Sequence, residues 1–457
     1  MSLRTSSTNL KSQMVESAGS LAEFLRSVAH PARVRILAAA IPGESTLAEL
    51  MRETKLSKTA LMNHLAILAS AGLVERVSRG AYRTTEDGRG LLAAAVSVHK
   101  GSMKRTREEK EAIRRTYATS FTGVKEMERK ELKKIEYVPC WLSYLGAMAG
   151  CLRHLGVRCG TREVGGYSGY AFLINVSEGE TCPSGPTALH LKTFREMVHG
   201  TESLGWKIDV FVHQHPYPAK EGAPTAEEMA LVRGVFERIK REIDHKQRPV
   251  VLWGLAAPEY GIVRGYEGDS YLVKTFRSLS QPHVPESAIP FYELKAPGCI
   301  DAFYFKEKLK VSKAAARRGA LDRALRFASG EVDVAKNYVA GPQAFEEWAS
   351  VLESLEDSKQ NYMGNSYVGA CVQEGREISG SFLAQVAKQL PANQARRLKA
   401  ASASYAKGAR LMSSFTRLFP FQFQGAMPLE KRKKGAQLLR KVRAEEDKAV
   451  HLIRKVC

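Results

Sequence analysis

The spacing of apolar and capping residues in the first hundred positions constrains the fold more than any other feature of the chain. Apolar residues recur at intervals of three and four over residues 21–28, which is the pattern of a short amphipathic helix. Pro31 suits the first turn of a second helix, because its fixed φ matches the helix and its missing amide hydrogen is not needed there. Thr46 and Glu49 have the three-residue spacing of a capping box. Three short helices are therefore predicted before residue 55.

A fourth helix is predicted to begin after Ser57, which can cap it, and to run to about residue 70. Leu61, Leu65 and Leu68 lie on one face of this helix and are predicted to be buried. The opposite, early surface carries Lys58, Thr59, Met62 and Asn63. Because the first turns of the second helix in such a pair read the bases, these four residues are predicted to contact DNA.

Two short strands are predicted next, over residues 73–77 and 81–84. Arg79 and Gly80 form the turn between them, which gives a two-stranded wing with Arg79 at its tip. Thr85 then caps a fifth helix. We expect Asn63 and Thr59 to read base edges, whereas Arg79 and Lys58 contact phosphate or the minor groove.

Four stretches carry a resemblance to a known family. They read AHPARVRIL (29–37), SKTALMNHL (57–65), AGLV (71–74) and YRTTEDGR (82–89). In this order they resemble the ArsR-type and related winged-helix regulators, and the resemblance implies a DNA-binding transcription regulator that acts as a homodimer. Metal-sensing members carry cysteines in the third helix, but residues 46–50 here read TLAEL. Metal sensing is therefore not expected, and His30 and His64 are interpreted as capping or packing residues.

The composition is compatible with this interpretation. The chain has 69 Lys and Arg against 48 Asp and Glu, a formal net charge of +21, which favours a polyanionic partner such as double-stranded DNA. A generally basic surface is the alternative explanation. No apolar run approaches the ~20 residues that span a bilayer, and the first residues do not have the pattern of a secretory signal. The seven cysteines are scattered without metal-site spacing, which predicts a reduced, cytoplasmic protein without a metal site. No cofactor is expected.

The rest of the chain is predicted to be an α+β multidomain protein. The expected parts are a polar segment (1–19), the winged helix (20–100), a charged helical connector (101–136), an α+β domain (137–312) and a helical carboxy-terminal region (313–457). The connector is expected either to extend the dimer contact or to be a solvated linker. Helices are predicted in the last region over residues 314–328, 343–355, 380–389, 393–418 and 429–455. The basic cluster at 431–434 is interpreted as a solvated helix end or as a source of phosphate contacts.

The α+β region begins with a cysteine in front of an apolar helix. Cys140 precedes a helix predicted over residues 142–155 and ended by Gly156. Strands are predicted at 208–213 and 249–255, on either side of a helix at 225–243, and a hairpin follows over 259–266 and 271–276. A cysteine at a helix start with a later antiparallel hairpin is the layout of papain-like folds. A helix amino terminus favours the thiolate form.

A second resemblance rests on short motifs of this region. PCWLS (139–143), LRHLG (152–156), EYGIVRGYE (259–267), YVAG (338–341) and the later Trp348, Asn361 and Tyr362 carry it. They resemble the bacteriocin-processing cysteine peptidases and the butirosin-biosynthesis acyltransferase family, which implies a papain-like fold. In the peptidases a catalytic His stands six residues before the Gly-Tyr pair, where this chain has Glu259. The orienting Asp or Asn on the return strand is replaced by Lys274-Thr275.

These replacements remove the general base that would activate Cys140. Cys140 is therefore predicted not to be a nucleophile. We expect Cys140, Trp141, Glu259 and Tyr260 to line a pocket for a polar or cationic small-molecule effector. Three functions remain open: a regulator that senses an effector, an acyltransferase or peptidase-like enzyme that uses Cys140, and a regulator whose large region serves only assembly.

Overall fold

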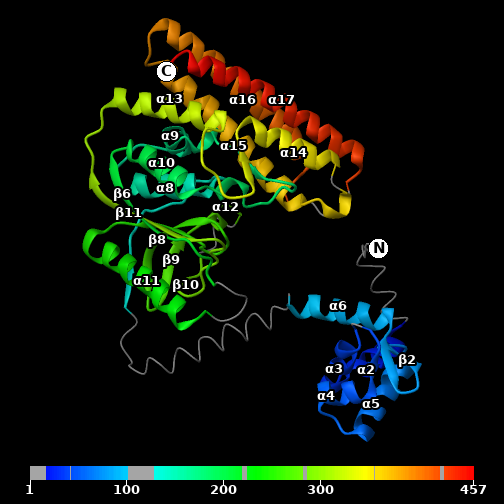
Figure 1. The fold of residues 1–457 in the computed structure, drawn as a ribbon. Coiled ribbons are helices and arrows are strands. Elements are labelled where there is room, and N and C mark those ends of the chain that lie inside the picture. Colours follow the sequence, from blue (N-terminus) through cyan, green and yellow to red (C-terminus); the bar gives the residue numbers. More distant parts are fainter. Residues whose placement is uncertain are drawn as a thin grey trace. The chain divides into compact units, whose positions relative to one another are not determined.

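The computed structural model describes residues 17–41, 43–100, 128–218, 224–280, 286–354, 356–421 and 427–457. The chain divides into two compact units, Met1–Val124 and Lys125–Cys457 (Figure 1). Each unit has its own core and is described by itself.

The first unit contains the predicted helices. They are α2 (Ala18–Val28), α3 (Pro31–Ala39), α4 (Leu47–Thr54), α5 (Lys58–Ser70) and α6 (Glu86–Lys100). The predicted caps are confirmed: the Glu49 amide donates to Thr46 Oγ1 at 3.3 Å, and the Ala60 amide donates to Ser57 Oγ at 3.3 Å. The leucines at 61, 65 and 68 are at most 1% exposed and pack against α3 and α4, so the helices share one apolar core.

The wing of the first unit has three strands rather than the two predicted. They are β1 (Ser45–Thr46), β2 (Val74–Ser78) and β3 (Ala81–Thr84), in the order β1-β3-β2. Gly80 makes the turn between β2 and β3 with φ of +85°, a conformation that favours glycine. The two residues of β1 are too few to show a period-two pattern, so the sequence does not predict this strand.

The second unit is built on an antiparallel sheet. Its strands are β4 (Arg129–Glu131), β6 (Trp206–His213), β7 (Val250–Trp253), β8 (Tyr260–Glu267), β9 (Ser270–Lys274), β10 (Ile289–Pro290) and β11 (Ile300–Lys308). They run in the order β10-β9-β8-β7-β11-β6, and β4 also pairs with β8. The predicted hairpin is confirmed as β8–β9, with Tyr266 opposite Tyr271. Helix α11 (Ala226–Lys246) packs on the sheet through Phe236, which stacks on Phe291.

The end of the predicted helical connector is a strand instead. Residues 129–131 form β4 along the second half of β8, with Lys130 opposite Tyr266. A Cβ at Gly265 would lie 2.3 Å from the Lys130 carbonyl oxygen, so glycine permits the close approach. The charged residues that suggested an exposed helix form ion pairs along these strands instead. Arg129 pairs with Glu131 on its own strand and with Glu267 on β8. Residues 101–127 of the expected connector lie outside the described residues.

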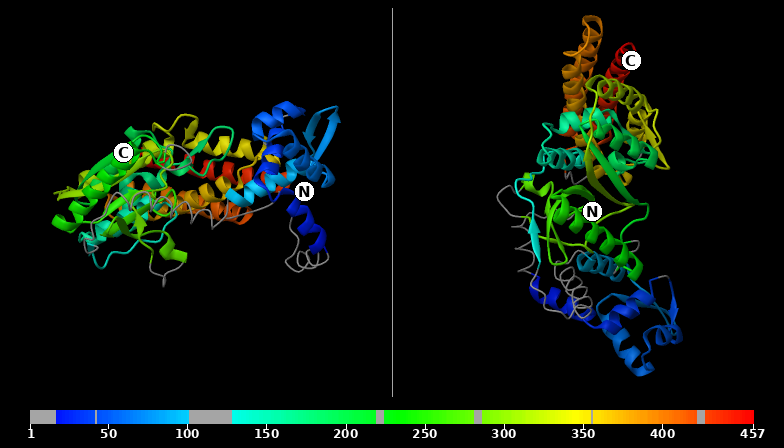
Figure 2. Two further views of the ribbon diagram at one scale, coloured as in Figure 1. Left: turned by 90° about the horizontal axis from the view of Figure 1, so that it is seen from below. Right: turned by 90° about the vertical axis from the view of Figure 1, so that its left-hand side faces the viewer.

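Helices form the other layer of the second unit (Figures 1 and 2). They are α8 (Ser143–His154), α9 (Thr161–Ser168), α10 (Leu191–Glu202), α13 (Lys313–Ser329), α14 (Pro342–Ser354), α15 (Tyr362–Ala387), α16 (Ala392–Leu418) and α17 (Leu429–Arg454), with the short α12 (Arg277–Ser280). Strands β5 (Asn175–Ser177) and β12 (Tyr338–Ala340) pair beside them. Because α15 packs on α9 as well as on α16, the regions 137–312 and 313–457 belong to one compact unit.

Helix α15 is much longer than the predicted segment at 380–389. Its first half contains glycines that sequence patterns do not favour in helices, and tight packing explains them. A Cβ at Gly364 would lie 1.5 Å from the Thr181 carbonyl oxygen, and one at Gly375 would lie 2.9 Å from the Ala171 carbonyl oxygen. Glycine therefore allows α15 to pass through the centre of the unit. Among the described helices, none is both long and apolar enough to cross a membrane.

Candidate functional site

The outer face of α5 is formed by the residues predicted to contact DNA. Lys58, Thr59, Met62 and Asn63 are all exposed in its first two turns. Within the described residues, Lys58, Thr59 and Asn63 have no side-chain hydrogen bond or ion pair. Lys55, in the left-handed conformation with φ of +56°, ends α4 and sets the turn into α5. The helix pair thus leaves two polar side chains and one cation free on the surface that follows the turn.

Met62 differs from its neighbours because it contacts the wing. The Tyr82 hydroxyl on β3 lies 3.8 Å from the Met62 sulfur, although the Met62 side chain is 41% exposed. This contact joins α5 to the sheet. Met62 therefore combines an exposed edge with a packing role.

The wing places Arg79 next to Gly80 at the β2–β3 turn, where Arg79 is exposed and without a partner in the described part of the chain. On the same wing, Arg83 pairs with Glu75 at 2.7 Å. Arg79 is thus the free cation of the turn, whereas Arg83 is neutralised by its neighbour.

The comparison with known families fits this geometry. A family model described as a helix-turn-helix domain matches residues 28–77, which extend from the last residue of α2 into β2. Residues 28–77 are a helix-turn-helix domain. No curated protein matches the chain.

The two histidines of the helix-turn-helix domain lie against each other, and one of them caps a helix. His30 Nδ1 accepts a hydrogen bond from the Ala32 amide at 3.1 Å and so caps α3. The rings of His30 and His64 lie 4.6 Å apart. Burial lowers the pKa of His64, and the nearby His30 and Arg33 lower it further. Over the described ranges of the whole chain, no group of three or more His, Cys, Asp or Glu residues could hold a metal ion.

The second unit places Cys140 at the start of α8 in an unexpected environment. Its side chain is 6% exposed, and its thiol lies 3.1 Å from Oε2 of Glu374 and 3.1 Å from the Leu142 carbonyl oxygen. Burial raises the pKa of the Cys140 thiol well above its usual range, and the Glu374 carboxylate raises it further. Burial and the Glu374 carboxylate thus both favour the neutral form of the Cys140 thiol.

Glu374 occupies the space in front of α8. Its Oε2 accepts hydrogen bonds from the amides of Trp141 at 2.8 Å and Leu142 at 3.0 Å, in addition to the Cys140 thiol. Burial raises the pKa of Glu374, and the hydrogen bonds from Leu142, Cys140 and Trp141 oppose this effect. One carboxylate oxygen therefore uses the donors that an oxyanion would need at this helix start.

Glu259, which stands in the place of the peptidase histidine, lies in the same cluster. The Tyr367 hydroxyl of α15 donates to Glu259 Oε1 at 2.6 Å, and burial raises the pKa of Glu259. The indole of Trp141 meets the rings of Tyr367 and Phe421 edge-on. The structure thus brings Cys140, Trp141 and Glu259 together under α15.

Tyr260 has a different environment from the other three predicted pocket residues. Its hydroxyl donates to Asp301 of β11 at 2.9 Å, and its ring packs against Trp253 and Tyr144 in the core. On the return strand, at the position of the orienting Asp or Asn of the peptidases, the Lys274 amine pairs with Glu136 at 3.3 Å. The group that contacts the Cys140 thiol and opposes its ionisation is therefore the Glu374 carboxylate.

Sequence reasoning missed Glu374 and Tyr367. Both lie in the first part of α15, where glycines hid the helical pattern. A helix drawn through this segment would have placed Tyr367, Cys371 and Glu374 on one face, three and four residues apart. That spacing was the available signal.

Proposed function

We propose that the chain is a DNA-binding transcription regulator that reads duplex DNA through α5 and the β2–β3 wing. The observation that carries the proposal is the outer face of α5, the capped helix that follows the turn of the helix-turn-helix domain. On this face the side chains of Lys58, Thr59 and Asn63 are exposed. An Asn side chain can bond both adenine edge groups in the major groove, and Lys58 and Arg79 can neutralise phosphates.

The regulator acts as a homodimer on a nearly palindromic site with half-sites about one helical turn apart. The resemblance to ArsR-type regulators supports this, as do the helices α2 and α6 at the two ends of the domain. The experiment is selection of binding sites from a random duplex library with the full chain. Light scattering of the complex then gives the stoichiometry. A selected set without half-site symmetry, bound by a monomer, would contradict the dimer.

The second unit is proposed to be a papain-like domain that binds a small effector and has lost catalysis. The position of Cys140 before the buried α8 and the β8–β9 hairpin with Glu259 support the fold. The raised pKa of the Cys140 thiol, caused by burial and by Glu374, supports the loss of catalysis. An enzyme that used Cys140 would need a base and a free helix start, and Glu374 occupies the latter.

The enzyme alternative is tested directly. Purified full-length protein is incubated with a thioester or peptide substrate panel, and Cys140→Ser serves as the control. Turnover that disappears in Cys140→Ser would replace the sensor proposal with a cysteine-dependent acyltransferase or peptidase. If there were no turnover, and if the small molecules tested also left DNA affinity unchanged, the second unit would serve assembly only.

A further inference from the structure

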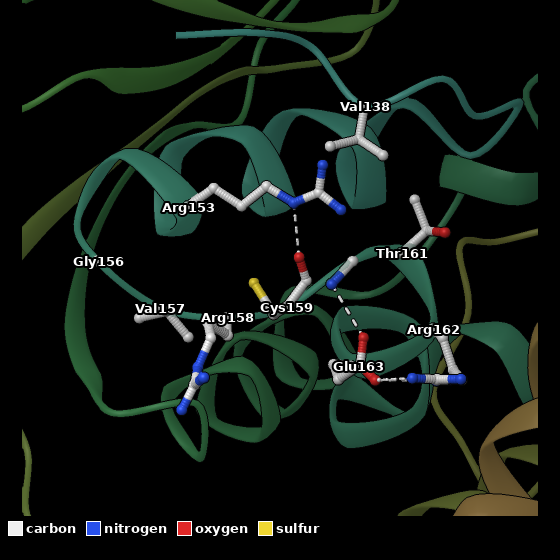
Figure 3. A pocket seen from close by; sticks show the side chains of 10 residues that line it. Val138, Arg153, Gly156, Val157, Arg158, Cys159, Thr161, Arg162 and Glu163 are labelled. Atoms are coloured by element: carbon white, nitrogen blue, oxygen red, sulfur yellow. Dashed lines mark hydrogen bonds and ion pairs between the residues drawn. The ribbon is translucent and has the colours of Figure 1, made fainter. Parts of the chain in front are cut away.

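A cavity of the second unit lies away from the Cys140 thiol, between the carboxy-terminal end of α8 and the first turn of α9 (Figure 3). Its volume is about 780 Å³, and Arg153, Arg158, Cys159, Thr161 and Arg162 are among the residues that line it. This volume lies in the range of ~300–1,000 Å³ that is usual for small-molecule sites. The cavity opens broadly to the surface, so a ligand could enter without a structural change.

The cavity lining carries excess positive charge. It includes three arginines and one carboxylate, Glu163. That carboxylate is already engaged, since it accepts from the Gly160 amide at 2.9 Å and pairs with Arg162 at 2.7 Å. Neither Arg153 nor Arg158 has a carboxylate partner within the described ranges. Two guanidinium groups are thus left without a counter-charge.

The guanidinium of Arg153 is held in a defined position. Its Nε donates to the Cys159 carbonyl oxygen at 2.6 Å, which leaves both amino groups free. Figure 3 shows this guanidinium extending from α8 toward Thr161 and Val138, with Arg158 on the other side of the loop. An ideal Cβ at Gly160 would lie 3.3 Å from Arg153 Nη2, so glycine keeps the space beside the amino groups open. The Thr161 hydroxyl, at the edge of this space, has no partner in the part of the chain that the structure describes.

We propose that this cavity binds the phosphate or carboxylate group of a small effector. Arg153 supplies the fork of two N–H donors that matches two oxyanion oxygens, and Arg158 adds charge at the rim. The proposal rests on the proposed function and deepens it, because it gives the effector an acidic group, whereas a polar or cationic effector is expected at Glu259. Bound there, the ligand would bridge α8 and α9, and α9 packs on the same α15 that carries Glu374.

The test measures ligand binding and DNA binding separately on the full chain. Inorganic phosphate and citrate are titrated by calorimetry in chloride buffer at constant ionic strength. The wild type is expected to show saturable binding at one site. Arg153→Gln is expected to weaken it about tenfold or more, and Arg153→Lys should recover only part, because it restores the charge without the fork. Binding of phosphate without citrate identifies a phosphorylated effector, and the reverse identifies a carboxylate.

Two further variants keep the result interpretable. Arg158→Gln breaks no described contact and should weaken binding severalfold even if Arg153→Gln disturbs the loop. Arg396→Gln, on the exposed face of α16 with only a contact to Asn393, is the matched control and should bind like the wild type. Absence of saturable binding of either anion, or wild-type binding by both Arg153→Gln and Arg158→Gln, would overturn the proposal.

DNA affinity, measured by fluorescence anisotropy without added anion, separates the two proposals. If the chain bound the anion but no duplex, the proposed DNA-binding function would be wrong and the anion site would be supported. If the chain bound DNA but neither anion, the anion site would be wrong and the DNA-binding function would be supported. If Arg153→Gln weakened DNA binding while no anion bound, the arginine would be a phosphate contact to DNA and the effector site would be wrong.

Discussion

The carboxylate of Glu374 and the thiol of Cys140 meet at 3.1 Å in front of α8, although 234 positions separate them in the chain. The same carboxylate oxygen accepts from the amides of Trp141 and Leu142. A helix start next to a cysteine usually promotes the thiolate, because the amides favour negative charge. Here the favourable position is taken by a carboxylate, and a second negative charge beside it is opposed. This arrangement opposes activation of a cysteine at this helix start.

The first prediction concerns this pair. Because burial and Glu374 raise the pKa of Cys140, its thiolate fraction at pH 8 lies below that of an ordinary cysteine. Alkylation of Cys140 is therefore expected to be slow at pH 8 and to accelerate only at higher pH. Glu374→Gln removes the charge and lowers the thiol pKa, which should raise the rate at fixed pH roughly tenfold for each pKa unit lost.

The measurement is mass spectrometry of the Cys140 peptide after iodoacetamide treatment over a pH series. The other six cysteines then do not interfere with the readout. Glu377→Gln, on the exposed side of the same helix, is the control and should leave the profile nearly unchanged. A wild-type profile with a midpoint below that of a free thiol would show that Glu374 does not silence Cys140.

The local patterns of the helix-turn-helix domain were sufficient to predict it, and those of the second unit only in part. Caps such as Thr46–Glu49 and turns such as Gly80 act over a few residues, so a single sequence contains the whole signal. The Cys140–Glu374 contact depends on where α15 lies relative to the residues that precede α8, which is tertiary information. Gly364 shows the same limit. A glycine is needed there because the Thr181 carbonyl oxygen, far away in sequence, occupies the space that a Cβ would take. Propensity therefore failed where close packing required glycine.

The second prediction concerns base reading by α5. Asn63→Ala is expected to relax the preference at one base-pair position, at a cost of ~1–3 kcal/mol for the preferred site, because the two amide contacts are lost. Affinities for the selected site and its single-base variants are compared by fluorescence anisotropy. Ser70→Ala, at the far end of the same helix, should behave like the wild type. An equal loss on specific and random duplexes would assign Asn63 to the backbone instead.

The third prediction concerns the wing. Arg79→Ala should weaken binding to all duplexes alike and reduce the slope of log affinity against log salt by about one, because one phosphate contact is lost. Arg83→Ala is the matched control on the same wing, since Arg83 is already paired with Glu75. A change of sequence preference in Arg79→Ala, with an unchanged salt slope, would mean that Arg79 reads bases.

The last prediction concerns the stability of the second unit. Arg376 and Glu446 are 0% and 1% exposed, and the guanidinium also donates to the Leu173 carbonyl oxygen at 2.9 Å. Removing one partner leaves an uncompensated buried charge, so Arg376→Met should lower the free energy of unfolding by ~3–5 kcal/mol. Arg443→Gln on α17 breaks an ion pair whose side chains are 36% and 33% exposed, and should cost only ~0–1 kcal/mol.

Urea unfolding followed by tryptophan fluorescence reports on this unit alone, because all four tryptophans lie within it. If the charge and not the packing is responsible, a second change, Glu446→Met, should restore most of the loss. A single variant that unfolds at the wild-type urea concentration would show that the pair adds nothing to the contact between α15 and α17.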